Sequence, residues 1–261
     1  MEKGWIAVAG QDARQQAAAK ALEQAGWRLI EPGSKAQLLL LPMPLRMEEK
    51  ELANLLAKLR PGTLVLAGVV GSQAAARIEG VGCRLVDYAR REELALGNAV
   101  PTAEGCLQIL LAGRSRTLWG SRVAITGFGR IAQLVARDLA ALGARPLVLA
   151  RSPAQLARAE SWGLDTAPLD QLADRVKGLD CAVNTVPALL FTRQVLAGME
   201  KGALVVDLAS APGGADRQAA QELGVRLEWA TGLPARCAPQ TAGEILARTV
   251  EAIWKERGEM Q

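Results

Sequence analysis

A glycine-rich turn limits the fold of this chain more than any other feature. An apolar run over residues 122–126 leads into Gly127–Ala132 (Gly-Phe-Gly-Arg-Ile-Ala), and a helical pattern follows at once. Gly127 permits a tight turn, and Gly129 lets the backbone approach a pyrophosphate because glycine has no Cβ. A second apolar run over 145–150 completes a β-α-β unit, which favours a dinucleotide-binding Rossmann domain over a purely structural glycine turn.

The end of the second strand indicates which dinucleotide binds. Enzymes that select NAD usually place Asp or Glu there to hold the ribose 2′-hydroxyl, whereas this chain has Arg151 and Ser152. A guanidinium and a hydroxyl fit a 2′-phosphate, so we favour NADP, and NAD stays possible. Arg158 either adds a second positive charge or belongs to a solvated helix face.

Composition restricts the class of protein. With 261 residues, of which 50% are hydrophobic, the chain can fill two domains. We see no apolar run that approaches a membrane span and no signal sequence, so we expect a cytoplasmic protein without a membrane partner. The net charge of +4 comes from scattered residues, and one Tyr and two Phe offer little base stacking, which argues against nucleic acid.

Histidine is absent, and the four cysteines stand far apart. We therefore expect no metal site, and we expect the cysteines to be buried in a reduced compartment. Proton transfer must depend on a carboxylate, Lys, Tyr, Cys or water.

Strands alternate with helices along the chain, so the predicted fold class is α/β with two parallel-sheet domains. The first domain spans residues 1–98 and serves the substrate or a partner. The second, over 99–239, is the Rossmann domain. A helix that begins at Pro101 links them, and a C-terminal helix within 240–261 returns to the first domain. Predicted strands cover 5–9, 27–30, 37–41, 63–67, 83–86, 122–126, 145–150, 181–184, 203–208 and 226–229.

A string of short segments points to one family. They are 87–88, 91–94, 98–105, 127–130, 184–188, 207–214, 232–234 and 238–243. In this order they resemble the A subunit of dipicolinate synthase. One departure is Gln240, where Lys is common in the family's motif.

The resemblance implies NADP-dependent oxidation of dihydrodipicolinate to dipicolinate, the pyridine dicarboxylate of bacterial endospores. It also implies that the partner is a flavoprotein-like B subunit, that the protein forms a homo- or hetero-oligomer, and that it works in the mother-cell cytoplasm of a sporulating bacterium. The reaction would branch from lysine biosynthesis.

Such a substrate needs anchors for two carboxylates. Our candidates are Arg14, Thr102, Ser210 and Thr241. Instead of binding substrate, Arg14 could be an exposed residue at the start of a helix that pairs with Asp12. Thr102 could instead be an N-terminal helix cap.

Glu104 and Asp207 are the candidates for proton transfer. Instead of transferring a proton, Glu104 could form a capping box at a helix start. The carboxylate of Asp207 could instead bond to the backbone of the 210–214 loop. Because the product becomes aromatic, a strong base is not required. The predicted cofactor contacts are Gly127, Phe128, Gly129, Arg130, Ile131, Arg151, Ser152, Asn184, Thr185, Val186, Pro187 and Gly232.

Two other functions stay open. One is a two-domain NADP-dependent oxidoreductase that acts on another small carboxylate, although such enzymes typically use a His or a Lys/Asp pair. The other is a non-catalytic NADP-binding protein that senses redox state or acts as a scaffold.

Overall fold

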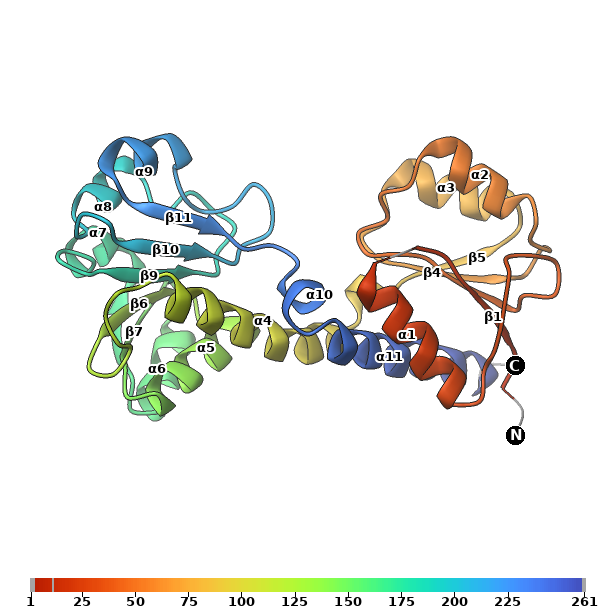
Figure 1. Ribbon diagram of the computed structural model, residues 1–261, viewed down its shortest axis with the longest axis horizontal. Coiled ribbons are helices and arrows are strands. Elements are labelled where there is room, and N and C mark those ends of the chain that lie inside the picture. Colours follow the sequence, from red (N-terminus) through yellow and green to blue (C-terminus); the bar gives the residue numbers. More distant parts are fainter. Residues whose placement is uncertain (1–2, 11, 260–261) are drawn as a thin grey trace. The chain divides into compact units, whose positions relative to one another are not determined.

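The computed structural model describes residues 3–10 and 12–259. It divides into two compact units, of which unit 1 comprises Met1–Asn98 and Ala238–Gln261, and unit 2 comprises Ala99–Cys237. Each unit holds its own parallel β-sheet with helices on both faces (Figure 1). The α/β class with two parallel sheets is confirmed.

Unit 1 has a five-stranded sheet in the order β2-β1-β3-β4-β5. Its elements are β1 (Trp5–Val8), α1 (Ala13–Gln24), β2 (Arg28–Ile30), β3 (Leu38–Leu40), α2 (Glu49–Leu56), β4 (Leu64–Ala67), α3 (Ser72–Gly80), β5 (Arg84–Asp87), the 3-10 helix η1 (Tyr88–Arg90) and α11 (Pro239–Glu259). Helices α1 and α11 cover one face of the sheet, and α2 and α3 cover the other (Figure 1).

Strand β3 shows why these elements form. Leu38 and Leu40 pack in the layer with α1 and α11, whereas Leu39 and Leu41 pack in the layer with α2 and α3. Successive side chains of a strand point to opposite faces, so an unbroken apolar run is what a strand covered on both faces requires.

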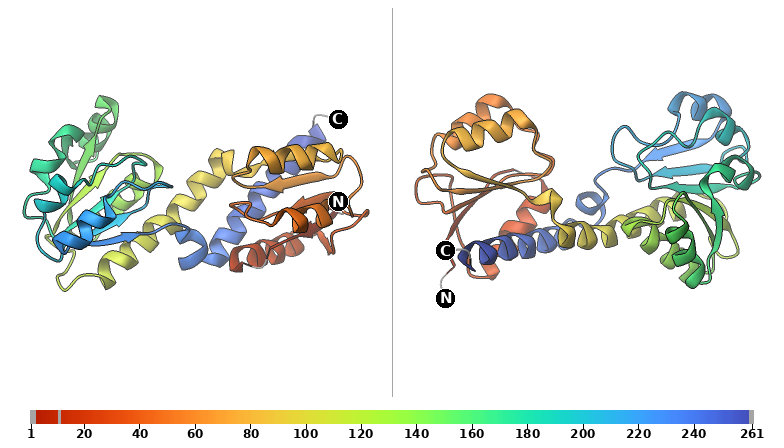
Figure 2. Two further views of the ribbon diagram at one scale, coloured as in Figure 1. Left: turned by 90° about the horizontal axis from the view of Figure 1, so that it is seen from above. Right: turned by 180° about the vertical axis from the view of Figure 1, so that it is seen from behind.

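The C-terminal helix α11 lies beside α1 in unit 1 (Figure 2). A Cβ on Gly243 would lie 2.5 Å from the Cβ of Ala17, so glycine permits the close approach of the two helices. Ile245 and Val250 of α11 then join the core. The predicted return of this helix to the first domain is confirmed.

Unit 2 has a six-stranded sheet in the order β11-β10-β9-β6-β7-β8. Its elements are β6 (Arg122–Thr126), α5 (Arg130–Ala141), β7 (Arg145–Ala150), α6 (Pro153–Ser161), β8 (Asp165–Pro168), the 3-10 helix η2 (Leu169–Gln171), α7 (Leu172–Arg175), β9 (Cys181–Asn184), α8 (Arg193–Ala197), β10 (Leu204–Asp207), α9 (Arg217–Leu223), β11 (Arg226–Trp229) and α10 (Leu233–Cys237). The sequence did not predict β8.

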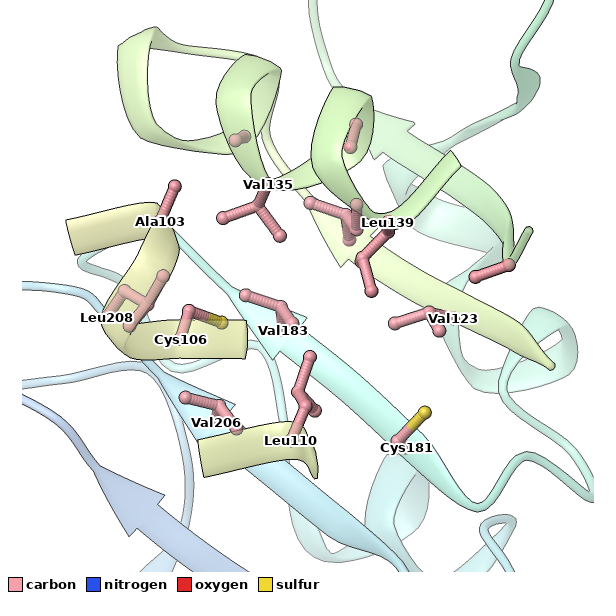
Figure 3. Close-up of a cluster of buried hydrophobic side chains, with 14 of the residues drawn as sticks. Ala103, Cys106, Leu110, Val123, Val135, Leu139, Cys181, Val183, Val206 and Leu208 are labelled. Carbon is pink, nitrogen blue, oxygen red and sulfur yellow. The ribbon is translucent and has the colours of Figure 1, made fainter. Parts of the chain in front are cut away.

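Helices α4 (Glu92–Ala112) and α5 pack on one face of this second sheet. Figure 3 shows Cys106 and Leu110 of α4 beside Val183 of β9 and Val206 of β10, with Val135 of α5 nearby. The opposite face packs against α7, α8 and α9.

Helix α4 is one element with Pro101 in its interior. The prediction that a helix begins at Pro101 is therefore wrong. An interior proline removes one backbone N–H and crowds the carbonyl four residues earlier, at a cost of about 3 kcal/mol. Leu94, Ala103 and Leu110 are buried on this helix, and their packing offsets that cost.

By length and composition α4 is also apolar enough to cross a membrane, which corrects the expectation that no such segment exists. Its 18-residue apolar window is 44% buried. Ala103, Cys106 and Leu110 of this helix belong to the core of unit 2, whereas Leu96, Val100 and Leu111 are exposed.

Two further expectations about packing are corrected. Cys83, Cys106 and Cys181 are buried, but Cys237 is exposed at the end of α10. Burial raises the pKa of the Cys181 thiol to about 12, so this thiol stays protonated at neutral pH. Tryptophan side chains are usually mostly buried, so Trp119 is expected to contribute to packing, but it is 78% exposed.

Candidate functional site

The glycine turn follows β6 at the carboxyl edge of the second sheet. Gly127 has a φ of 81°, a backbone conformation that favours glycine. A Cβ at this position would also lie 2.9 Å from Oγ1 of Thr185 and 3.0 Å from Cγ2 of Val186. The turn therefore needs glycine for its backbone and for the loop that passes over it.

Helix α5 begins directly after Gly129. Apart from Gly129 and its two chain neighbours, no heavy atom of the described residues lies within 4 Å of a Cβ built on Gly129, and among the described residues no side-chain hydrogen bond caps the helix. Ala132 is fully buried, so the helix lies close to the sheet. Open space before an uncapped helix N-terminus is what a pyrophosphate requires, and these residues fit a dinucleotide.

A hollow of about 350 Å³ lies at this turn, and we call it the cofactor hollow. Its lining is Gly127, Phe128, Gly129, Ala150, Arg151, Ser152, Gln155, Leu169, Thr185, Val186 and Pro187. Thus the structure brings the glycine turn, the two residues after β7 and the loop after β9 to one surface. Ligands of parallel α/β sheets bind at this edge.

Three residues of the lining, Ala150, Gln155 and Leu169, were missed. Gln155 lies in the first turn of α6, and Pro153, a residue common at the first position of a helix, was a usable signal. Leu169 follows β8, a strand that the sequence did not reveal. Conversely, the predicted contacts Arg130, Ile131 and Gly232 lie outside the lining of the hollow: Arg130 and Gly232 are exposed, and Ile131 packs against the core.

The last residues of three adjacent strands form a buried hydrogen-bond network. Thr126 of β6 donates to Oδ1 of Asn184 at 2.6 Å, and Nδ2 of Asn184 donates to Oδ1 of Asp207 at 2.7 Å. Thr126 and Asn184 are fully buried, and Asp207 is 2% exposed. The side chains of two predicted site residues, Asn184 and Asp207, therefore lie below the surface.

Asp207 also binds the loop that follows β10. Its Oδ1 accepts from the backbone N–H of Ala209 at 3.1 Å, and its Oδ2 accepts from that of Gly214 at 2.6 Å. This arrangement matches the alternative in which Asp207 orders the loop over residues 210–214. Ser210 itself is exposed on that loop.

In unit 1, Arg14 lies in the first turn of α1, after the carboxyl end of β1. Its side chain is only 8% exposed, so the alternative of an exposed helix-start residue is wrong. Nη2 donates to the carbonyl of Met43 at 2.5 Å and lies 4.0 Å from Oδ2 of Asp12. Among the described residues Nε has no hydrogen-bond partner, although buried donors normally have one.

The remaining candidates lie on helices. Thr102 is buried and Glu104 exposed, both within α4, so neither the predicted N-cap nor the capping box exists there. Thr241 is exposed in the first turn of α11. Thr102 and Glu104 belong to unit 2, and Thr241 belongs to unit 1.

Comparison with known proteins supports this site. Residues 108–219 match the family model described as D-isomer specific 2-hydroxyacid dehydrogenase, NAD binding domain. The chain is also 40% identical over 173 residues to the A subunit of dipicolinate synthase from Bacillus subtilis (strain 168). That alignment covers 66% of this chain and 58% of the length of the relative.

Solved structures extend the similarity to the full chain. The crystal structure of the A chain of dipicolinate synthase from Bacillus subtilis has 30% identity and a TM-score of 0.87, covering 100% of this chain and 99% of that one. The chain belongs to the family of dipicolinate synthase A subunits. A second family structure, from Bacillus halodurans, has 29% identity and a TM-score of 0.86, covering 96% of this chain and 97% of that one.

Membership of this dipicolinate synthase family, with the NAD-binding domain match, makes the chain an NAD(P)-dependent oxidoreductase with a nicotinamide dinucleotide cofactor. The matched range holds the glycine turn, Arg151 and the loop after β9. A transhydrogenase from Sinorhizobium meliloti, with 16% identity and a TM-score of 0.78, shares the fold alone.

Proposed function

We propose that this chain is the A subunit of a dipicolinate synthase and oxidises dihydrodipicolinate to dipicolinate with NADP. The observation that carries the proposal is its family membership, together with a hollow that gathers a glycine turn, Arg151 and Ser152 at one sheet edge.

The preference for NADP is supported by Arg151 and Ser152. Both follow β7 and line the cofactor hollow, at the position where Rossmann domains read the ribose 2′ substituent. Arg151 is exposed, and an arginine fork can bind a phosphate with two parallel hydrogen bonds. Arg158 is exposed on α6 outside the lining of the hollow.

One carboxylate of the substrate is assigned to Arg14. A buried guanidinium whose Nε–H has no hydrogen-bond partner among the described residues calls for an anionic acceptor, and a carboxylate fits it. Thr102, Ser210 and Thr241 are the further candidates for substrate hydrogen bonds.

The proposed reaction removes a hydride from a ring carbon and a proton from the ring. The bound dinucleotide supplies the hydride acceptor. Because the product gains aromaticity, positioning contributes more than a strong base, which agrees with the absence of histidine. Glu104 is the proposed proton acceptor, since its side chain is exposed, whereas the carboxylate of Asp207 already accepts three hydrogen bonds.

The proposed setting follows from the same family. The chain would act with a flavoprotein-like B subunit in the mother-cell cytoplasm of a sporulating bacterium, at a branch from lysine biosynthesis.

Detection of the reaction product tests this proposed function. The chain is mixed with its B partner, NADP and freshly generated dihydrodipicolinate, and the ultraviolet absorption of dipicolinate is recorded. We expect product with the natural chain and none above background with Gly127→Val, since a side chain at Gly127 would meet Thr185 and Val186.

Absence of product in every pairing would contradict the proposal. Turnover of another small carboxylate under the same conditions would support the second oxidoreductase function. Cofactor binding without turnover of any substrate would support the sensor or scaffold.

A further inference from the structure

We propose that Thr126, Asn184 and Asp207 form a positioning network for the nicotinamide half of the dinucleotide and that none of the three side chains touches it. The network holds two loops, 185–187 and 209–214, at the edge of the sheet. This inference rests on the proposed dinucleotide-dependent function, and it gives Asn184 and Asp207 indirect roles.

The strand register brings the three residues together. Thr126 pairs with Asn184 across β6 and β9, and Asn184 pairs with Asp207 across β9 and β10. Each is the last residue of its strand, where the side chain can reach the following loops. Three polar side chains therefore form one row across the carboxyl edge of the sheet.

The hydrogen bonds have a single direction along this row. The Thr126 hydroxyl donates to Oδ1 of Asn184, so Nδ2 of Asn184 faces the carboxylate of Asp207. The backbone N–H of Val186 donates to Oδ1 of Asn184, and the carbonyl of Val186 accepts from Nδ2, which excludes the flipped amide. The orientation of Asn184 is therefore fixed by the backbone, and the Thr126 hydroxyl matches it as a donor.

The fixed amide holds the loop after β9. Oδ1 of Asn184 accepts from the N–H of Val186 at 3.1 Å, and Nδ2 donates to the carbonyl of Val186 at 3.0 Å. Thr185 adds a bond from its hydroxyl to the carbonyl of Thr126 at 2.7 Å. Thr185 and Val186 line the cofactor hollow, so the network determines the shape of that wall.

Asp207 holds the second loop through the N–H groups of Ala209 and Gly214. A Cβ on Gly214 would lie 2.1 Å from Nδ2 of Asn184, so the loop returns directly onto the network. The side chains that end β6, β9 and β10 thus order both loops from below the surface.

The strand order indicates which half of the cofactor these loops meet. The pyrophosphate lies over the turn after β6, and the 2′ substituent of the adenosine half is read after β7, at Arg151. Because β9 and β10 lie on the opposite side of β6 from β7, the other half extends over the network. We therefore place the nicotinamide half above the loops that Thr126, Asn184 and Asp207 hold.

Comparing the binding of two ligands distinguishes this positioning role from a general effect on the stability of the fold. Calorimetry measures the binding of NADP and of 2′,5′-ADP, which carries the adenosine half alone. Thr126→Val removes the hydroxyl with little change in shape, and we expect NADP to bind about five- to twentyfold more weakly. Binding of 2′,5′-ADP should change less than about twofold, since Arg151 lies on the other side of the turn.

Two control variants test whether the loss of the Thr126 hydroxyl causes the change in affinity. Thr126→Ser keeps a hydroxyl and should restore most of the affinity for NADP. Thr166→Val makes the same change in β8, where the hydroxyl binds exposed Glu160, and should leave both affinities unchanged.

Equal weakening of both ligands by Thr126→Val, or unchanged NADP binding, would overturn the inference. If the natural chain bound neither ligand, the proposed function itself would fail. A check that needs no variant is hydrogen exchange in the natural chain without cofactor. We expect slow exchange at the amides of Val186 and Gly214, and rapid exchange at both would also overturn the inference.

Discussion

At the residue scale, the choice between the two nicotinamide dinucleotides depends on Arg151. It follows β7, lines the cofactor hollow beside Ser152 and Gln155, and its side chain is exposed. A guanidinium there attracts a 2′-phosphate, whereas a carboxylate would repel it and accept a hydrogen bond from a 2′-hydroxyl.

We therefore expect Arg151→Asp to lower the ratio of kcat/KM for NADP to that for NAD by about ten- to a hundredfold. Steady-state kinetics with each dinucleotide measures this ratio. Arg158→Asp makes the same charge change outside the lining of the hollow and should shift the ratio far less. An unchanged ratio in Arg151→Asp would remove the argument for NADP.

The sequence located the residues of the cofactor hollow better than it located buried polar contacts. Gly127, Arg151 and Thr185 were predictable because a turn between a strand and a helix has a recognisable pattern. The indirect position of Asn184 was not, because it depends on which strands are neighbours, and the loop contact of Asp207 was predicted only as an alternative. Strand order arises from tertiary packing, which a linear pattern does not contain.

At the element scale, most strands were predictable to within one or two residues, because each apolar run is bounded by polar or glycine residues. Helix α4 was not, since Pro101 suggested a helix start and tertiary packing overrode that preference. Strand β8 has only one fully buried position, Ala167, so its hydrophobic pattern was too weak to predict it.

An ion pair joins α11 to the residue before α4 within unit 1. Arg91 donates from both Nη atoms to the carboxylate of Glu256, at 2.8 and 2.6 Å. The hydrogen bond from Arg91 lowers the pKa of Glu256 below its ordinary value of 4.5. A carboxyl group with a lowered pKa stabilises the folded state above the unfolded-state pKa, and this contribution is lost as the pH falls through the folded-state pKa.

Glu256→Gln should therefore lower the unfolding temperature slightly at pH 7, because exposed ion pairs contribute little. The difference from the natural chain should shrink as the pH falls below 4.5 and disappear once the pH lies below the folded-state pKa of Glu256. Thermal unfolding at several pH values measures it, and Glu244→Gln on the exposed side of α11 is the control. A difference that persisted in acid would show that the ion pair is not its cause.

At the scale of the whole molecule, the chain combines two α/β units with different features at their strand ends. Unit 2 provides a glycine turn and a hollow that fit a dinucleotide. Unit 1 provides a buried arginine with a free donor among the described residues, which fits a carboxylate. The predicted fold class is confirmed, because the spacing of apolar residues and the placement of glycines determine it. The identity of the substrate depends on side-chain contacts, which the sequence pattern leaves open.

The proposed reaction couples oxidation of a reduced pyridine dicarboxylate to reduction of NADP. The most direct test records NADPH and dipicolinate together, with the B partner present, during one reaction. We expect both products to appear in equal amounts and both to be lost when NADP is omitted. Formation of dipicolinate at the same rate without any NADPH would contradict this coupling.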